Sequence, residues 1–172
     1  QTLAACLKSV AWADEIIVVD MRSTDGTAMI ARKAGAKVFT FDDVGYVEPA
    51  RNFALSKATG EYVLLVDADE EIPVSLHKQL AAIAKAGAQD VCALARKNLV
   101  FGDWVAHAGW WPDYQIRFFK NGSVQWPETI HAQPTFSGTP HRLPAREDLA
   151  ILHHNYPTVS SFLERLNRYT DI

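Results

Sequence analysis

The stretch GEYVLLVDADEEIP, residues 60–73, runs from a block of apolar side chains directly into a cluster of carboxylates. Residues 62–66 form a nearly continuous hydrophobic run, which is typical of a strand buried on both faces of a parallel sheet. The carboxylates that follow are Asp67, Asp69, Glu70 and Glu71. Because ligands bind beyond the carboxyl ends of the strands in open α/β sheets, this junction predicts a core strand that ends at a binding crevice.

Strand-like and helix-like segments alternate around this stretch through the first half of the chain. Short apolar runs predict strands over 15–20, 36–41 and 61–67. Periodic apolar positions, with glycines near several of the expected ends, predict helices over 2–12, 27–34, 48–58 and 73–86. This alternation is typical of βαβ units with right-handed crossovers, and it predicts an α/β fold with a mostly parallel sheet.

The pattern changes after about residue 90. Strand-like segments follow at 91–101, 114–120, 123–126 and 151–156. Asn121-Gly122 is a signal for a tight hairpin, and an amphipathic helix is expected at the end of the sequence. We therefore expect one domain over residues 1–172, with an α/β half over 1–90 and a mixed, aromatic-rich half over 91–172.

Composition narrows the class of protein. A chain of 172 residues with 48% apolar and 22% charged residues is typical of one globular domain. The net charge of −3 leaves no basic excess to displace counterions from phosphates, so nucleic acid is not an expected partner. Cys6 and Cys92 lie in apolar surroundings, which favours buried thiols and a reducing, cytoplasmic setting.

The acidic end of the third expected strand predicts a cation site. In extended backbone Asp67 and Asp69 point to the same side, because side chains alternate with period two. Two carboxylates so placed repel each other, which raises a pKa or recruits a cation. Mg²⁺ or Mn²⁺ is the expected cation, since both take oxygen ligands and bridge carboxylate to phosphate. We interpret Glu70 and Glu71 as charges in the first turn of the next helix.

Three segments together resemble the family 2 glycosyltransferases of the GT-A fold: VVDMRSTDGT (18–27), ARNFAL (50–55) and GEYVLLVDADEEIP. Two later segments, GWWPDYQIRFF (109–119) and IHAQ (130–133), are similar to the subgroup that adds sugars to bacterial lipopolysaccharide cores and related glycans. The resemblance implies a metal-dependent, inverting transferase with a nucleotide-sugar donor, UDP-linked, and a cell-envelope glycan or glycolipid acceptor. Residues 1–90 would then bind the nucleotide-sugar, and residues 91–172 the acceptor.

The resemblance also implies roles for individual residues of the first half. Asp20 matches the position that reads the uracil or ribose of the donor. Arg51 matches a position near the base and phosphates, and Asn52 accompanies it. Asp67 would face the ribose, and Asp69 would ligate the metal under the diphosphate. Taken alone, Asp20 could equally be a helix cap and Arg51 a surface ion pair.

In the second half, the resemblance places the catalytic base at Asp113, although the usual Glu-Asp pair is Pro112-Asp113 here. Glu128 is the reserve candidate for the base. His131 would contact the metal or diphosphate, although the subgroup follows this histidine with Glu where this chain has Ala132. The structural alternatives are a turn aspartate at Asp113 and a hydrogen-bonded structural histidine at His131.

Several alternatives stay open. The family sheet begins with a strand and an Asn-Glu turn that this sequence does not contain, so we expect a sheet without its first strand. Either that strand lies outside this sequence, or the fragment is impaired in binding; a catalytically silent fragment is one option. Strand-end aspartates are also found in Mg²⁺-binding receiver domains of signalling proteins. Two segments could approach the inner face of the cell membrane: residues 117–119 and the terminal helix with Arg165 and Arg168. The alternative is that residues 117–119 belong to the core and that the helix presents a solvated face. The sequence does not indicate an oligomeric state.

Overall fold

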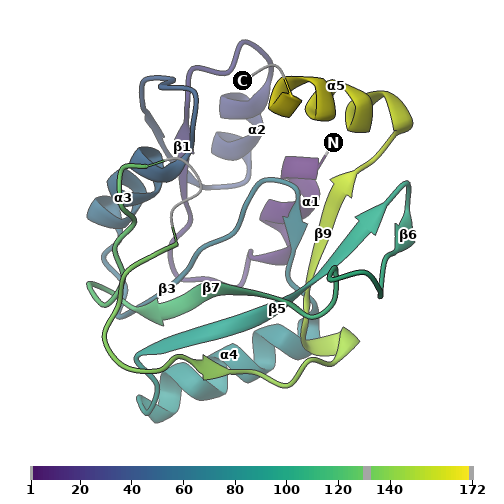
Figure 1. The fold of residues 1–172 in the computed structure, drawn as a ribbon. Coiled ribbons are helices and arrows are strands. Elements are labelled where there is room, and N and C mark those ends of the chain that lie inside the picture. The colour runs from purple at the N-terminus through teal and green to yellow at the C-terminus, as the bar shows by residue number, and fades with distance from the viewer. Residues whose placement is uncertain (1, 130–132, 171–172) are drawn as a thin grey trace.

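The computed structural model describes residues 2–129 and 133–170, which form an α/β structure with two sheets (Figure 1). The helices are α1 (Thr2–Ser9), α2 (Thr27–Lys33), α3 (Glu48–Lys57), α4 (Val74–Ala86), the 3₁₀ helix η1 (Glu147–Leu149) and α5 (Val159–Thr170). The strands are β1 (Ile17–Asp20), β2 (Lys37–Thr40), β3 (Tyr62–Leu64), β4 (Glu70–Glu71), β5 (Val91–Val100), β6 (Asp103–Trp104), β7 (Asp113–Lys120), β8 (His141–Arg142) and β9 (Ile151–Tyr156). The predicted α/β class is confirmed.

The smaller sheet is the βαβ unit predicted from the first half of the chain. β1 and β2 pair in parallel, with Ile17 opposite Lys37, and α2 connects them. Leu7 of α1 packs with the buried Ala31 and Ala36 under this pair. The unit therefore holds Asp20, the last residue of β1, at the carboxyl end of a strand.

The larger sheet has the strand order β3-β7-β5-β9-β4 and combines both halves of the sequence. β5 is its centre, since it pairs antiparallel with β7 on one edge and parallel with β9 on the other. β3 joins this sheet through antiparallel pairing with β7, in which Leu64 lies opposite Phe118. This arrangement places the residues after β3 beside the middle of β7.

The main core lies between the larger sheet and α4, which crosses below β5 in Figure 1. Leu76 and Leu80, one helical turn apart, are buried against Leu94 and Ile151 of the sheet. Gly87 ends the helix with a φ of 63°, a left-handed conformation that glycine adopts without steric cost. This core fixes the larger sheet as a rigid support for the residues at its edges.

β1 and β3 do not pair with each other, and a groove of about 1330 Å³ lies between them. Its walls include Val18 and Val19 of β1 and Val63 of β3, and Figure 1 shows β1 standing apart from β3 and β7. The groove continues to the acidic residues Asp67 and Asp69. The segment after β3 therefore borders this hollow through Asp67, and Met21, the residue after β1, also lines it, whereas Asp20 is not part of its lining.

Three local predictions were wrong. Glu70 and Glu71 form the short strand β4 opposite β9, and they are not the start of α4. Asn121-Gly122 makes a turn, but no hairpin follows, because β7 already pairs with β3 and β5 on its two edges. Residues 123–126 contribute only an isolated bridge between Gln125 and Thr135.

The membrane-facing alternative for residues 117–119 was also wrong. Arg117, Phe118 and Phe119 are buried in the larger sheet, so this segment is part of the core. None of the helices formed by residues 2–129 and 133–170 is both long and apolar enough to cross a bilayer.

Candidate active site

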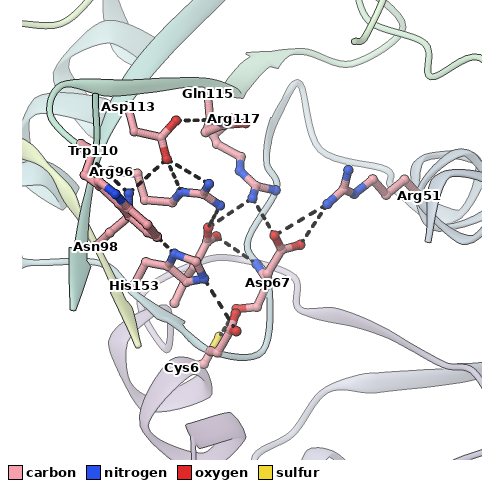
Figure 2. Close-up of polar contacts among 12 residues, drawn as sticks. Cys6, Arg51, Asp67, Arg96, Asn98, Trp110, Asp113, Gln115, Arg117 and His153 are labelled. Carbon is pink, nitrogen blue, oxygen red and sulfur yellow. Dashed lines mark hydrogen bonds and ion pairs between the residues drawn. The ribbon is translucent and has the colours of Figure 1, made fainter. Parts of the chain in front are cut away.

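Asp67 lies between two arginines just beyond β3 (Figure 2). Arg51 Nη2 of α3 donates to Asp67 Oδ1 at 3.2 Å, and Arg117 Nη2 of β7 donates to Asp67 Oδ2. Burial alone would raise the pKa of Asp67, but the charges and hydrogen bonds of Arg117 and Arg51 hold it far below its ordinary value of 3.8. The charge conflict expected at this strand end is therefore relieved at Asp67 by guanidinium groups.

Asp69 turns toward a different set of partners. The backbone turns tightly after Asp67, since Glu70 N donates to Asp67 O at 3.0 Å, so the extended geometry expected for residues 67–69 was wrong. Asp69 Oδ2 lies 3.5 Å from Nε2 of His153, whose Nδ1 is 2.6 Å from Oδ1 of Asn98. Asp67 and Asp69 nevertheless line the same groove.

The side chains around Asp69 can be tested as ligands for the predicted divalent cation. Among the residues that the structure describes, no cluster of three or more His, Cys, Asp or Glu side chains could hold a metal by itself. Mg²⁺ commonly binds through one or two carboxylates, substrate phosphates and waters, and it does not need a full protein cage. Asp69, whose side chain is 32% exposed beside the groove, offers such a carboxylate. The donor chemistry fits the predicted ion.

α3 contributes two adjacent residues to the site. The guanidinium of Arg51 lies over the ring of Trp126, 5.7 Å from its centroid, and this contact complements its ion pair with Asp67. Asn52 donates from Nδ2 to Trp126 O at 2.7 Å and accepts from Trp126 N at 3.0 Å. In the structure Asn52 thus holds the backbone of Trp126 against α3, while Arg51 faces the groove.

Asp20 is buried at the end of β1, where Oδ1 accepts a hydrogen bond from Ser23 N at 3.0 Å. This contact stabilises the turn after the strand. The nearby Arg22, at a φ of 60°, pairs with Asp42 on the surface. The structure shows no direct contact between Asp20 and the Arg51–Asp67 pair among its described hydrogen bonds and ion pairs.

Asp113, the predicted base, begins β7 and is surrounded by donors. Arg96 Nε and Asn98 Nδ2 donate to Oδ2 at 2.8 and 3.1 Å, and Gln115 Nε2 donates to Oδ1 at 2.7 Å. Burial would raise the pKa of Asp113, but these hydrogen bonds and the charge of Arg96 keep it below 3.8. Asp113 also lines a small pocket of about 150 Å³ with Trp110.

Glu128, the reserve candidate for the base, is not part of this cluster. Glu128 is exposed, and the contact recorded for it is through its backbone oxygen, which accepts from the hydroxyl of Tyr46 at 3.3 Å. His131 lies outside the described residues, so its role stays a prediction. Asp113 is therefore the predicted acid–base candidate that the structure connects to Asp67.

The connection between Asp113 and Asp67 runs through residues that the sequence did not assign to the site. Glu70, which is 0% exposed, accepts from Arg117 at 3.0 Å and from Arg96 at 3.4 Å. The interpretation of Glu70 as a helix-start charge was wrong, because β4 inserts it into the larger sheet. Arg96 and Asn98 gave a signal in the sequence: together with Lys97 they form a polar stretch within the otherwise apolar strand β5.

Cys6 lies beneath the acidic turn. Its Sγ atom is 3.5 Å from Asp67 O, in a geometry in which the thiol donates. Burial, together with the charges of the neighbouring carboxylates Glu70 and Asp67, raises the pKa of Cys6 to about 12. The neutral thiol therefore supports the turn as a hydrogen-bond donor and is not a nucleophile.

This fold and site define a class of protein that comparison with known families identifies. Residues 1–164 match the family model described as Glycosyl transferase family 2, and the chain belongs to this family. The match decides against the receiver-domain alternative.

Two curated relatives match about half of the chain. A TPR repeat-containing protein from Synechococcus elongatus is 45% identical over 73 residues, which are 42% of this chain and 18% of that protein. An uncharacterized glycosyltransferase from Rickettsia conorii is 44% identical over 77 residues, which are 45% of this chain and 27% of that protein. The match thus covers about a quarter or less of these curated relatives.

Solved structures of S. aureus TarS resemble the fold. The structure of TarS residues 1–349 superposes with a TM-score of 0.64 at 21% identity, covering 95% of this chain and 59% of that chain. The same fragment in complex with UDP-GlcNAc gives a TM-score of 0.51 at 33% identity, covering 56% of this chain and 31% of that chain. The predicted GT-A fold is confirmed by this likeness.

Proposed function

We propose that the chain transfers a sugar from a UDP-linked nucleotide-sugar to a hydroxyl group of a cell-envelope glycan or glycolipid, such as a lipopolysaccharide core. The observation that carries the proposal is the placement of two ionised carboxylates. Asp67 lies with Arg51 and Asp69 on the large groove, and Asp113 lies on a separate small pocket. Family membership and the UDP-GlcNAc complex of TarS support a nucleotide-sugar as the donor.

On the donor side, the chain's own residues bind and orient the nucleotide. Arg51 supplies a positive charge at the groove, which suits a diphosphate. Asp67, held by Arg117 and Arg51, is ionised and able to accept a hydrogen bond from a ribose hydroxyl. Asp69 would hold a divalent ion, and the ion when bound would neutralise charge on the departing diphosphate.

On the acceptor side, Asp113 takes a proton. The acceptor oxygen attacks the anomeric carbon while the bond from that carbon to the diphosphate oxygen breaks, and the hydroxyl proton passes to Asp113. The donors Arg96, Asn98 and Gln115 keep Asp113 ionised but make it a weak base. It therefore accepts the proton late, when bond formation has already made the hydroxyl acidic.

Calorimetric titration with UDP, GDP and CDP, each with and without MnCl₂, tests the proposal. We expect UDP to bind, and to bind more tightly with Mn²⁺, since the metal links the diphosphate to Asp69. Tighter binding of GDP or CDP than of UDP would contradict the assignment of uracil as the nucleobase of the donor. Binding of none of the three nucleotides would contradict the proposed function.

A further inference from the structure

Glu70 is a carboxylate enclosed entirely within the protein. It is 0% exposed on β4, opposite His153 of β9. An isolated buried charge is strongly unfavourable, so its partners decide whether it can stay ionised. Oε1 accepts from Arg117 Nη2 at 3.0 Å and from Arg96 Nη1 at 3.4 Å, and Oε2 accepts from the backbone N–H of Asp67 at 2.9 Å.

Each of the two arginines also binds a second carboxylate, on opposite sides of Glu70. The same Nη2 atom of Arg117 donates to Asp67, and Arg96 donates to Asp113 from Nε at 2.8 Å. The charges therefore alternate without a break along Asp113, Arg96, Glu70, Arg117 and Asp67. Figure 2 shows this row between the labelled residues Asp113 and Asp67.

The two ends of the row lie on different cavities. Asp67 lines the large groove, whereas Asp113 lines the small pocket with Trp110 and Asn155. Arg96 lines both cavities, and Glu70 is the carboxylate that joins its guanidinium to that of Arg117. A displacement of Glu70 would thus displace the arginines that contact Asp67 on the large groove and Asp113 on the small pocket at the same time.

We infer that Glu70 is a positioning residue that holds the donor-side carboxylate Asp67 and the acceptor-side carboxylate Asp113 in one fixed arrangement through Arg117 and Arg96. The inference rests on the proposed function, which assigns Asp67 to the donor side and Asp113 to the acceptor side. Glu70 contacts no substrate. It fixes Arg117 and Arg96 by charge, and it fixes the acidic turn directly through the Asp67 N–H.

The chemistry of the position requires a carboxylate of this length. A glutamine keeps the shape but presents no negative charge to the two guanidinium groups, and its NH₂ end is a donor that faces other donors. An aspartate keeps the charge but is one methylene shorter, so it cannot keep both the arginine contacts and the Asp67 N–H. Glu71, the next residue on β4, pairs with His154 at 2.7 Å outside the row and provides a matched control.

The test compares Glu70→Gln with Glu71→Gln in two measurements, each expressed per folded molecule: UDP affinity with Mn²⁺, and the saturated rate of UDP-GlcNAc hydrolysis, with water as acceptor. We expect Glu70→Gln to weaken UDP binding and to slow hydrolysis, each by roughly 10–100-fold, as when residues that orient functional groups are removed. Glu71→Gln should leave both within about 3-fold. A purely structural Glu70 would lower Tm but change neither value, and that result would overturn the inference.

A second measurement does not depend on nucleotide. In ¹⁵N NMR spectra, Asp113→Asn should shift the Arg117 Nε–Hε signal in the wild-type background and leave it unchanged in Glu70→Gln, because Glu70 carries the connection. No shift in either background would overturn the inference. If the shift is present but the wild-type protein binds none of UDP, GDP and CDP, the proposed function fails while the linkage through Glu70 stands.

Discussion

Arg117 donates from a single Nη2 atom to both Asp67 and Glu70, and its side chain is only 4% exposed. The two carboxylates come from a turn and a two-residue strand that follow β3, whereas Arg117 lies within β7. Pairing of β3 with β7 brings these segments together. One buried cation therefore connects the acidic turn to the larger sheet.

Replacing Arg117 with methionine tests the importance of this cation for stability. The variant leaves Asp67 and Glu70 without their shared partner, and breaking a buried ion pair in this way costs roughly 3–5 kcal/mol. Urea denaturation should show this loss in the free energy of unfolding. Arg146→Met removes an exposed pair with Asp148 and should cost less than about 1 kcal/mol. Equal losses in the two variants would contradict the interpretation.

Replacing Asp113 with asparagine tests the catalytic base. The change is nearly isosteric and lies away from the groove that would hold the nucleotide, so UDP affinity should stay within about 3-fold of wild type. Sugar transfer should fall by roughly 10²–10⁴-fold, the usual contribution of a general base. Transfer rates of Asp113→Asn and Glu128→Gln, measured side by side, decide between the two candidates. A large loss in Glu128→Gln alone would move the base to Glu128.

The low pKa of Asp113 predicts a defined pH dependence of stability. Because the folded-state pKa lies below 3.8, the unfolded chain binds the proton more tightly, and ionised Asp113 stabilises the fold above that pH. This contribution is lost as the pH falls through the folded-state pKa. The difference in the free energy of unfolding between wild type and Asp113→Asn should therefore be largest above about pH 4 and shrink below it. A difference that grows on acidification would contradict the assignment.

The sequence predicted the regular elements better than the contacts among them. β1, β2, α2, α3 and α4 were predicted within a few residues, because apolar periodicity and helix-ending glycines are local signals. β4 was missed because its two residues are defined only by pairing with β9. The hairpin at Asn121-Gly122 was wrong for a related reason, since the edges of β7 are occupied by distant strands.

The same limit applies to the site. Asp67, Asp69 and Arg51 were predicted as site residues from strand ends and family resemblance, and the structure places all three on one groove, while their roles stay predictions. The contacts of Glu70 could not be predicted, because its partners Arg96 and Arg117 lie 26 and 47 residues away in the sequence. From sequence alone, a charged residue next to a predicted helix is interpreted as exposed to solvent, because its tertiary contacts are not known.

The central claim is that Asp69 couples a divalent ion to a nucleoside diphosphate in the large groove. Calorimetric titration of UDP with and without Mn²⁺ tests it most directly, in wild type, Asp69→Ala and the control Asp103→Ala, which changes an exposed residue of β6. We predict that Mn²⁺ tightens UDP binding by at least about 10-fold in wild type and in the control, and by less than about 2-fold in Asp69→Ala. The same Mn²⁺ dependence in all three proteins, or no binding of UDP by wild type, would contradict the claim.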